Sequence, residues 1–171
     1  MSDAVDFESD FMAGMKEIWE QRVPFNRFLG LQIQAFRAER VAAGFAIKPE
    51  LAGHLDGEWL HGGAISAALD AVGGLAVMAA FSARHKDEPA AHRLRHFDRM
   101  STIDLRVDYL RPPAGARFEV RAEVMRLGSR VACTRMEFFA AQGAMLACGT
   151  GAYNIAGAPR VPTPTDPRRS S

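Results

Sequence analysis

The chain has 171 residues, 48% of them hydrophobic and 24% charged, and its formal net charge is +1. These values are typical of one soluble globular domain, and they give no support for a nucleic-acid or anionic-membrane partner. The first ten residues are acidic and contain no apolar signal region. The two cysteines, Cys133 and Cys148, form no CxxC pair and are expected to be free thiols. We therefore expect a cytoplasmic protein.

The first third of the chain predicts one helix and two strands. Apolar residues recur at helical spacing over residues 4–22, and Pro24 is expected to limit that helix. Residues 30–38 and 40–48 alternate between apolar and polar side chains, which predicts two strands joined by a tight turn. Residues 49–61 read as a loop.

A long apolar helix is predicted from Gly62 to Ser82, and it contains one unexpected residue. Asp70 is the only charged side chain between Gly62 and Ala83. Burying an unpaired carboxylate costs several kcal/mol, so we expect Asp70 to have either a partner that offsets this cost or a function that requires it. The helix is otherwise rich in alanine and glycine, which gives it a thin body that a curved sheet can approach closely. The apolar run 71–81 is too short to span a bilayer.

The second half of the chain predicts a sheet. Residues 83–100 are charged and read as an irregular surface connection. Four strand-like runs with period-two alternation follow, which predicts an antiparallel meander. In the first of these runs, Thr102 and Asp104 are expected to share one face. Two strands, a long helix and four further strands indicate an α+β fold in which the sheet wraps around the helix.

The predicted organisation therefore has three parts. Residues 1–27 form an N-terminal helical extension, and residues 28–156 form the α+β domain. Residues 157–171, which contain four of the nine prolines, form a tail expected to be disordered.

The stretch HGGAISAALD resembles the active-site motif of hot-dog fold thioesterases of the phenylacetate-pathway type. The resemblance extends through STIDLRVDYLRP and RLGSRVA to GTGAY and covers residues 28–155. It implies a curved antiparallel sheet around a central helix, and homodimers or dimers of dimers. The function that we expect is hydrolysis of acyl-CoA thioesters with a medium-chain or aryl-acyl group to the free acid and CoA. The resemblance implies no cofactor.

The resemblance also implies roles for individual residues. The acid in the middle of the helix, Asp70, activates water or attacks the thioester. The backbone N–H of Gly62 serves as the oxyanion hole, and Thr102 on the following strand assists. Similar proteins often carry asparagine seven residues before the histidine of the motif, where this chain has His54. An imidazole can form similar hydrogen bonds, but its charge changes with pH.

The residues of the motif support these roles without the resemblance. A helix that begins at Gly62 offers free N–H groups and the positive end of its dipole to a developing oxyanion. The alternative is that Gly62 and Gly63 only permit a sharp turn into the helix. We place Gly63 among the substrate-binding residues, and we expect His61 to order the turn by hydrogen bonding rather than to act as the base. For Asp70, the alternative is a structural acid paired with an arginine of the sheet, such as Arg106.

The spacing of the motif has a geometric consequence. Gly62 and Asp70 are eight residues apart, which is about 12 Å along a helix. One reacting carbonyl cannot contact both groups of the same helix. We therefore expect the acid and the oxyanion donor of one site to come from two copies of the chain, related by a two-fold axis.

Arginine outnumbers lysine by 18 to 3, and several arginines lie at strand ends. Arginine binds phosphates well, so these residues are candidates for the CoA end of the substrate, with solvated surface charge as the alternative. The candidate CoA-binding residues are Arg111, Arg126, Gly128, Ser129 and Arg130. We expect no metal site, because His92 and His96 have i,i+4 spacing but lie in a segment that reads as irregular.

Two other functions remain open for this sequence. The first is hydration or dehydration of acyl thioesters, but the Asp-x-Asn-Pro-x-His and His-Phe-Pro patterns of such hot-dog enzymes do not occur in this chain. The second is a non-catalytic acyl-CoA-binding protein, which the presence of both the HGG motif and Asp70 disfavours.

Overall fold

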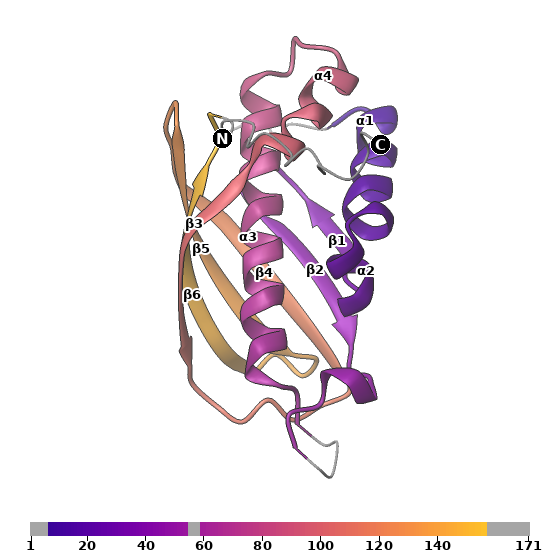
Figure 1. Cartoon of the computed structure of the whole chain (residues 1–171), viewed down its shortest axis with the longest axis vertical. Helices are drawn as coiled ribbons and strands as arrows, with labels where there is room; N and C mark the ends of the chain where they lie inside the picture. The colour runs from indigo at the N-terminus through magenta and orange to yellow at the C-terminus, as the bar shows by residue number, and fades with distance from the viewer. Residues whose placement is uncertain (1–6, 55–58, 157–171) are drawn as a thin grey trace, which may run out of the picture.

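One antiparallel sheet wraps around one long helix in the computed structural model, which describes residues 7–54 and 59–156 (Figure 1). Within these ranges the sheet has six strands in the order β1-β2-β4-β5-β6-β3. The central helix, α3 (Gly62–Arg84), packs against the sheet and is mostly buried. The expected α+β architecture is therefore confirmed. The strands are β1 (Gln32–Phe36), β2 (Val41–Ala46), β3 (Ser101–Tyr109), β4 (Arg117–Leu127), β5 (Val131–Ala140) and β6 (Met145–Asn154).

The two adjacent glycines in the middle of α3, Gly73 and Gly74, have different surroundings. At Gly73, a Cβ atom would overlap the Tyr153 hydroxyl and the Met136 sulfur, so only glycine permits this approach of the sheet. At the next residue, Gly74, a Cβ would have ordinary van der Waals contact, with the nearest atom of Tyr153 at 3.9 Å. The expected close contact is therefore confirmed at Gly73, whereas Gly74 faces free space.

The helix α3 has the length and mean hydropathy of a membrane-spanning helix. However, 67% of its most apolar 18-residue window is buried inside the protein. The burial is against the sheet, so α3 is the core helix of the fold.

The N-terminal residues form consecutive helical segments and not one helix. The α-helix α1 (Ser9–Lys16) continues as a π-helical turn, η1 (Glu17–Arg22). The first helical stretch ends at Arg22, before Pro24, as expected, and Pro24 itself starts a second short helix, α2 (Pro24–Leu29). Proline is tolerated in a first turn because its missing N–H would have no partner within the helix. Trp19 is the buried residue of η1.

The expected strands at 30–38 and 40–48 are confirmed as β1 and β2, each shortened at its ends. The predicted loop at 49–61 contains one turn of 3-10 helix, η2 (Pro49–Leu51). Both cysteine thiols are free, as expected, and half-buried. Three parts of the expected elements lie outside the described residues: 4–6 of the first helix, 55–58 of the loop, and the tail 157–171.

The expectation of an irregular connection over residues 83–100 is wrong. After α3, the segment forms the short helix α4 (Ala90–Arg95) and a 3-10 turn, η3 (Phe97–Arg99). Figure 1 shows α4 beside α1 at one end of the molecule. The charged composition of the segment gives no apolar pattern that predicts this helix. The helix is held by a contact with the distant N-terminal segment.

That contact is made by Arg93, whose side chain is 2% exposed. Its Nη2 donates a hydrogen bond of 2.7 Å to Oε2 of Glu8, and its guanidinium lies 4.6 Å from the centre of the Phe11 ring. The hydrogen bond from Arg93 holds the pKa of the Glu8 carboxyl below its usual value. A buried guanidinium requires such partners, so the pair ties α4 to the start of α1.

The expected meander is correct only for its last three strands. β4, β5 and β6 are sequential neighbours, but β3 pairs with β6 and not with β4. The connection from β3 to β4 therefore crosses the sheet past β6 and β5. β4 pairs with β5 along one of its edges and with β2 along the other. This arrangement leaves β3 as an edge strand directly beside α3.

Candidate active site

Asp70 lies half-buried near the middle of α3 and accepts a hydrogen bond from β3. The Oγ1 of Thr102 donates to Asp70 Oδ1 at 2.9 Å. The hydroxyl of Tyr153 on β6 donates to the backbone carbonyl of Asp70 at 3.0 Å. None of the described residues donates a hydrogen bond to Oδ2. One carboxylate oxygen is therefore fixed, and the other is available to a water molecule or a substrate.

A β-bulge directs Thr102 toward Asp70. Thr102 pairs with Tyr153 and Asp104 pairs with Ala152, so Ile103 is an extra residue on β3. Their partners Tyr153 and Ala152 are consecutive residues of β6 and point to opposite faces of the sheet, so Thr102 and Asp104 also point to opposite faces. The expectation that these two residues share a face is therefore wrong, because strict alternation does not hold across a bulge.

Tyr153 is a site residue that sequence reasoning missed, although it lies in the GTGAY segment. It is 2% exposed, and burial raises the pKa of its phenol well above the usual value, with the charge of Asp70 as the second cause. The phenol therefore stays protonated and acts as a hydrogen-bond donor. The absence of a side chain at Gly73 makes room for this hydroxyl against the helix.

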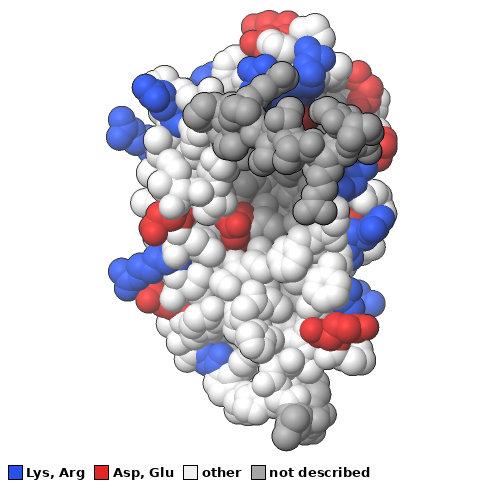
Figure 2. All heavy atoms as spheres, viewed as in Figure 1, with Lys and Arg blue, Asp and Glu red and all other residues white. Residues whose placement is uncertain are grey.

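A cavity of about 170 Å³ opens beside Asp70. It lies between the middle of α3, the N-terminal helices and the chain that leads into β3. Figure 2 shows a hollow on this face, and the described side chains below it are mainly uncharged. The cavity is lined by Trp19, Val23, Asn26, Asp70, Ala71, Gly74, Phe97, Met100, Ser101, Thr102 and Tyr153. Among the described residues, Asp70 is its only ionisable lining group apart from the protonated Tyr153.

The HGG turn forms the start of α3, where His61 is the N-cap residue. Its Nδ1 accepts a hydrogen bond of 2.8 Å from the Gly63 N–H, so the expected hydrogen bond of His61 at the turn is present. The N–H groups of Ala64 and Ile65 both donate to the His61 carbonyl. The Gly63 donor is therefore used internally. None of the described residues accepts a hydrogen bond from the Gly62 N–H, and a first-turn N–H of this kind can bind a ligand oxygen.

Tyr109, at the end of β3, is a second residue that sequence reasoning missed. Its hydroxyl donates to the Gly62 carbonyl at 3.0 Å, and its ring lies beside the Gly62 α-carbon. The same strand therefore contacts Asp70 through Thr102 and the HGG turn through Tyr109. The sequence shows Tyr109 only as one apolar position of an alternating strand.

The Asp70 side chain and the Gly62 N–H are both on α3, about 12 Å apart along the helix axis. Within a single chain, the rigid helix therefore keeps the two groups too far apart to contact the same carbonyl group. This geometry agrees with the spacing argument made from the sequence.

His54 lies close to the HGG turn. It is exposed, and its ring packs edge-on against Trp59 with the ring centroids 4.9 Å apart. The preceding residue, Gly53, lies against the backbone of His61. This places the His54 loop beside the N-terminus of α3.

The expected CoA-binding residues lie at opposite ends of the molecule. Arg111 follows β3, at the end near Gly62, and donates to the Met145 carbonyl at 2.6 Å. The turn 126–130, which contains Arg126, Gly128, Ser129 and Arg130, lies at the other end of α3, where Arg84 donates to the Leu127 carbonyl at 2.9 Å. A helix of 23 residues is about 34 Å long. One chain therefore does not bring the two groups together.

Comparison with known proteins identifies the family of this chain. The family model described as "Thioesterase superfamily" matches residues 57–147, from just before the HGG turn into β6. The chain is 34% identical over 139 residues to the medium/long-chain acyl-CoA thioesterase YigI of Escherichia coli (strain K12), covering 81% of this chain and 90% of that protein. The YigI protein of Salmonella typhimurium (strain LT2) matches to the same extent.

A solved structure shows the same fold. The crystal structure of a Shewanella oneidensis protein, described as related to the thioesterase superfamily, superposes with a TM-score of 0.79 at 37% identity. The match covers 86% of this chain and 96% of that one. The chain therefore belongs to the thioesterase superfamily, with the hot-dog fold, and is a thioester hydrolase. The comparisons do not distinguish the phenylacetate-pathway type, which stays a prediction.

The raised pKa of Tyr153 makes a prediction about stability at high pH. We expect Tyr153→Phe to lower the free energy of unfolding by about 1 kcal/mol at pH 8, because a buried hydrogen bond is lost. Above pH of about 10 the unfolded wild type loses its phenol proton while the folded protein keeps it. The contribution of Tyr153 is therefore present below that pH, and it declines by about 1.4 kcal/mol per pH unit above it.

Urea unfolding of both proteins between pH 8 and pH 11 tests this expectation. The stability advantage of the wild type should shrink above pH 10. A constant difference across the range would contradict the assignment of a buried, protonated Tyr153.

Proposed function

We propose that this chain hydrolyses acyl-CoA thioesters of medium or long chain length. The observation that carries the proposal is the Asp70 carboxylate, with Oδ1 held by Thr102 and Oδ2 open beside a mainly apolar cavity. An acyl chain in this cavity would bring its thioester carbonyl to the carboxylate. The similarity to YigI supports CoA as the carrier and supports this chain-length class. An aryl-acyl group, which the sequence also suggested, would require the same cavity.

In the proposed mechanism, Asp70 acts as a general base. Its Oδ2 accepts a proton from a water molecule, whose oxygen attacks the thioester carbon. The carbonyl oxygen becomes an oxyanion that accepts a hydrogen bond from a free Gly62 N–H at the positive end of a helix. The tetrahedral intermediate collapses, the C–S bond breaks, and the proton on Asp70 passes to the departing CoA sulfur. Direct attack by Asp70 on the carbonyl is the alternative, with water entering in a second step.

A homodimer would complete the site, because Gly62 and Asp70 of one chain are too far apart to serve one carbonyl. The edge strand β3 supports this interface. Ile103, Tyr109 and Leu110 are large hydrophobic side chains, each at least half exposed along or just beyond the free edge of β3. Unpaired edges with exposed apolar residues favour association with a second chain. Asp70 and Thr102 lie beside this edge, so each site would receive its oxyanion donor from the partner.

The remaining roles concern the periphery of the site. Arg111 lies at the end of the molecule that carries Gly62 and is the candidate that we retain for a CoA phosphate. We assign His54 a role in positioning water or the carbonyl at the HGG turn. Trp19 and Val23 of the N-terminal extension line one wall of the proposed acyl cavity. The expected cytoplasmic location agrees with a substrate carried on CoA.

Asp70→Asn tests the function and the base together. Thiol release should be measured for wild type and variant on acyl-CoAs with short, medium, long and arylacetyl chains. We expect the wild type to prefer medium or long chains, and the variant to lose about a hundredfold or more in kcat. A wild type that binds acyl-CoA without hydrolysis would indicate a binding protein. Full activity of Asp70→Asn would exclude Asp70 as base or nucleophile.

Gly62 offers a matched pair of variants for the oxyanion hole. Gly62→Pro removes the N–H at a first-turn position where proline is tolerated, and the extended backbone of His61 is compatible with a following proline. Gly62→Ala keeps the N–H, and its Cβ would lie 3.5 Å from the Tyr109 ring, an ordinary contact. We expect a loss of about 100-fold in kcat for proline and much less for alanine.

Mixing Gly62→Pro with Asp70→Asn then tests the shared site. A heterodimer has one site with both groups intact, so subunit exchange should restore part of the activity. Proven exchange without recovery would contradict the two-chain site, and equal losses for Gly62→Pro and Gly62→Ala would contradict the oxyanion role.

Gly74 tests the position of the acyl chain. It lies one turn after Asp70, lines the cavity, and has room for a Cβ. We expect Gly74→Leu to fill part of the cavity and to reduce kcat/KM for long-chain acyl-CoA by about tenfold or more relative to short chains. Gly74→Ala is the control and should keep the wild-type preference. A loss for Gly74→Leu that is uniform across chain lengths would place the acyl chain elsewhere.

A further inference from the structure

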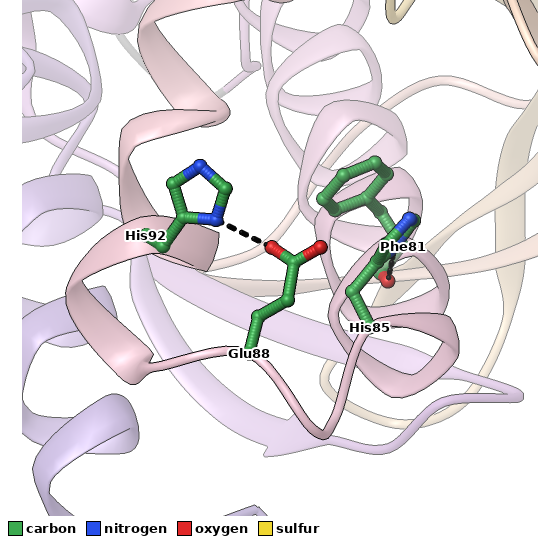
Figure 3. A network of polar contacts seen from close by, with 4 residues as sticks. All are labelled: Phe81, His85, Glu88 and His92. Atoms are coloured by element: carbon green, nitrogen blue, oxygen red, sulfur yellow. Dashed lines mark hydrogen bonds and ion pairs between the residues drawn. The ribbon is translucent and has the colours of Figure 1, made fainter.

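Three metal-ligating side chains meet on the segment between α3 and β3, away from the site described above. Glu88, His92 and His96 follow one another at intervals of four residues, and one ligand atom of each lies within 4.8 Å of the others. The Nδ1 of His92 is 2.6 Å from Oε2 of Glu88. Figure 3 shows the Glu88 carboxylate directed at the His92 ring. The two histidines share a helix face because α4 brings residues four apart together.

The surroundings of this cluster restrict one of its members. The ring of Phe81 on α3 packs against His96, with the ring centroids 4.2 Å apart. His85 stacks on the same phenylalanine, and its Nδ1 lies 2.9 Å from the Phe81 carbonyl oxygen, in hydrogen-bond contact. His85 is therefore held by α3 and is not part of the three-residue cluster. The His96 ring is fixed by packing, whereas Glu88 and His92 are partly exposed and adjustable.

We propose that Glu88, His92 and His96 bind one divalent transition-metal ion of the zinc class. Two imidazoles and one carboxylate are typical zinc ligands, and two histidines at i,i+4 on a helix are a common zinc-binding spacing. Mg²⁺ and Ca²⁺ prefer sites built of oxygen ligands only, so the two nitrogens select against them. With three protein ligands, water would complete a tetrahedral shell.

Metal binding requires only small adjustments of the three ligand atoms. In a tetrahedral site with bonds of about 2.0–2.1 Å, ligand atoms lie about 3.4 Å apart. Glu88 Oε2 and His92 Nδ1 are already closer than this, at 2.6 Å. The remaining separations of up to 4.8 Å can close by rotation of the two partly exposed side chains.

A bound ion would stiffen a segment that contacts two other parts of the protein. α4 is tied to the N-terminal segment by the ion pair between the buried Arg93 and the exposed Glu8. Phe97 and Met100, which follow the cluster directly, line the cavity beside Asp70. Since the three ligands come together only when this segment is folded, the ion should stabilise the native state by mass action. This inference does not depend on the proposed substrate.

Titration of the tag-free, full-length protein with ZnCl₂, followed by calorimetry, tests the proposal. We expect one Zn²⁺ per chain, a Tm increase of about 5 °C or more at a hundredfold excess over Kd, and no comparable binding of Mg²⁺ or Ca²⁺. Co²⁺ should give the visible absorption of a tetrahedral site. Absence of saturable binding at one equivalent, or equal binding of Mg²⁺, would overturn the proposal.

Three variants assign the ligands. We expect His92→Ala and Glu88→Gln to weaken Zn²⁺ binding at least tenfold, and Glu88→Gln keeps the size of the side chain in case His92→Ala disturbs α4. His85→Asn is the matched control, because it removes a neighbouring imidazole outside the cluster and should bind Zn²⁺ as the wild type does. Unchanged affinity in the first two variants, or an equal loss in His85→Asn, would show that the ion binds elsewhere.

Discussion

The close packing of the sheet on α3 is the constraint on which the rest of the site depends. Gly73 has no side chain, so the hydroxyl of Tyr153 reaches the helix and donates to the Asp70 carbonyl. Tyr153 is also the strand partner of Thr102, which donates to the Asp70 carboxylate. A packing contact and the chemistry therefore share the same residues. Any side chain at Gly73 would push apart the two elements that position the acid.

The cavity beside Asp70 lies where the next residue of α3, Gly74, faces a different side of the helix from Gly73. Gly74 faces free space, and the N-terminal helices close that space with Trp19. The segment after α3 completes the wall, held in place by Arg93 across the N-terminal helix. A mainly apolar space that ends at one carboxylate suits a substrate with a hydrocarbon chain and one reactive polar group.

The proposed division of the site along α3 would connect catalysis to assembly. A rigid helix keeps the Gly62 N–H about 12 Å from Asp70, so no side-chain movement in one chain can unite them. The edge strand β3 contacts both groups: Tyr109 donates a hydrogen bond at the HGG turn, and Thr102 donates one to the Asp70 carboxylate. An interface along β3 would bring the two kinds of group together twice, once for each chain.

The sequence by itself determined the features that a local pattern can encode. A single charge in a long apolar helix identifies Asp70, and period-two alternation identifies the strands. Only the tertiary structure decided how the strands pair, because pairing depends on contacts between distant residues. It placed β3 at the edge, and the extra residue Ile103 turned Thr102 toward the acid. It also formed α4, whose charged sequence carries no clear period, through the contact of Arg93 with Glu8, which lies 85 residues earlier.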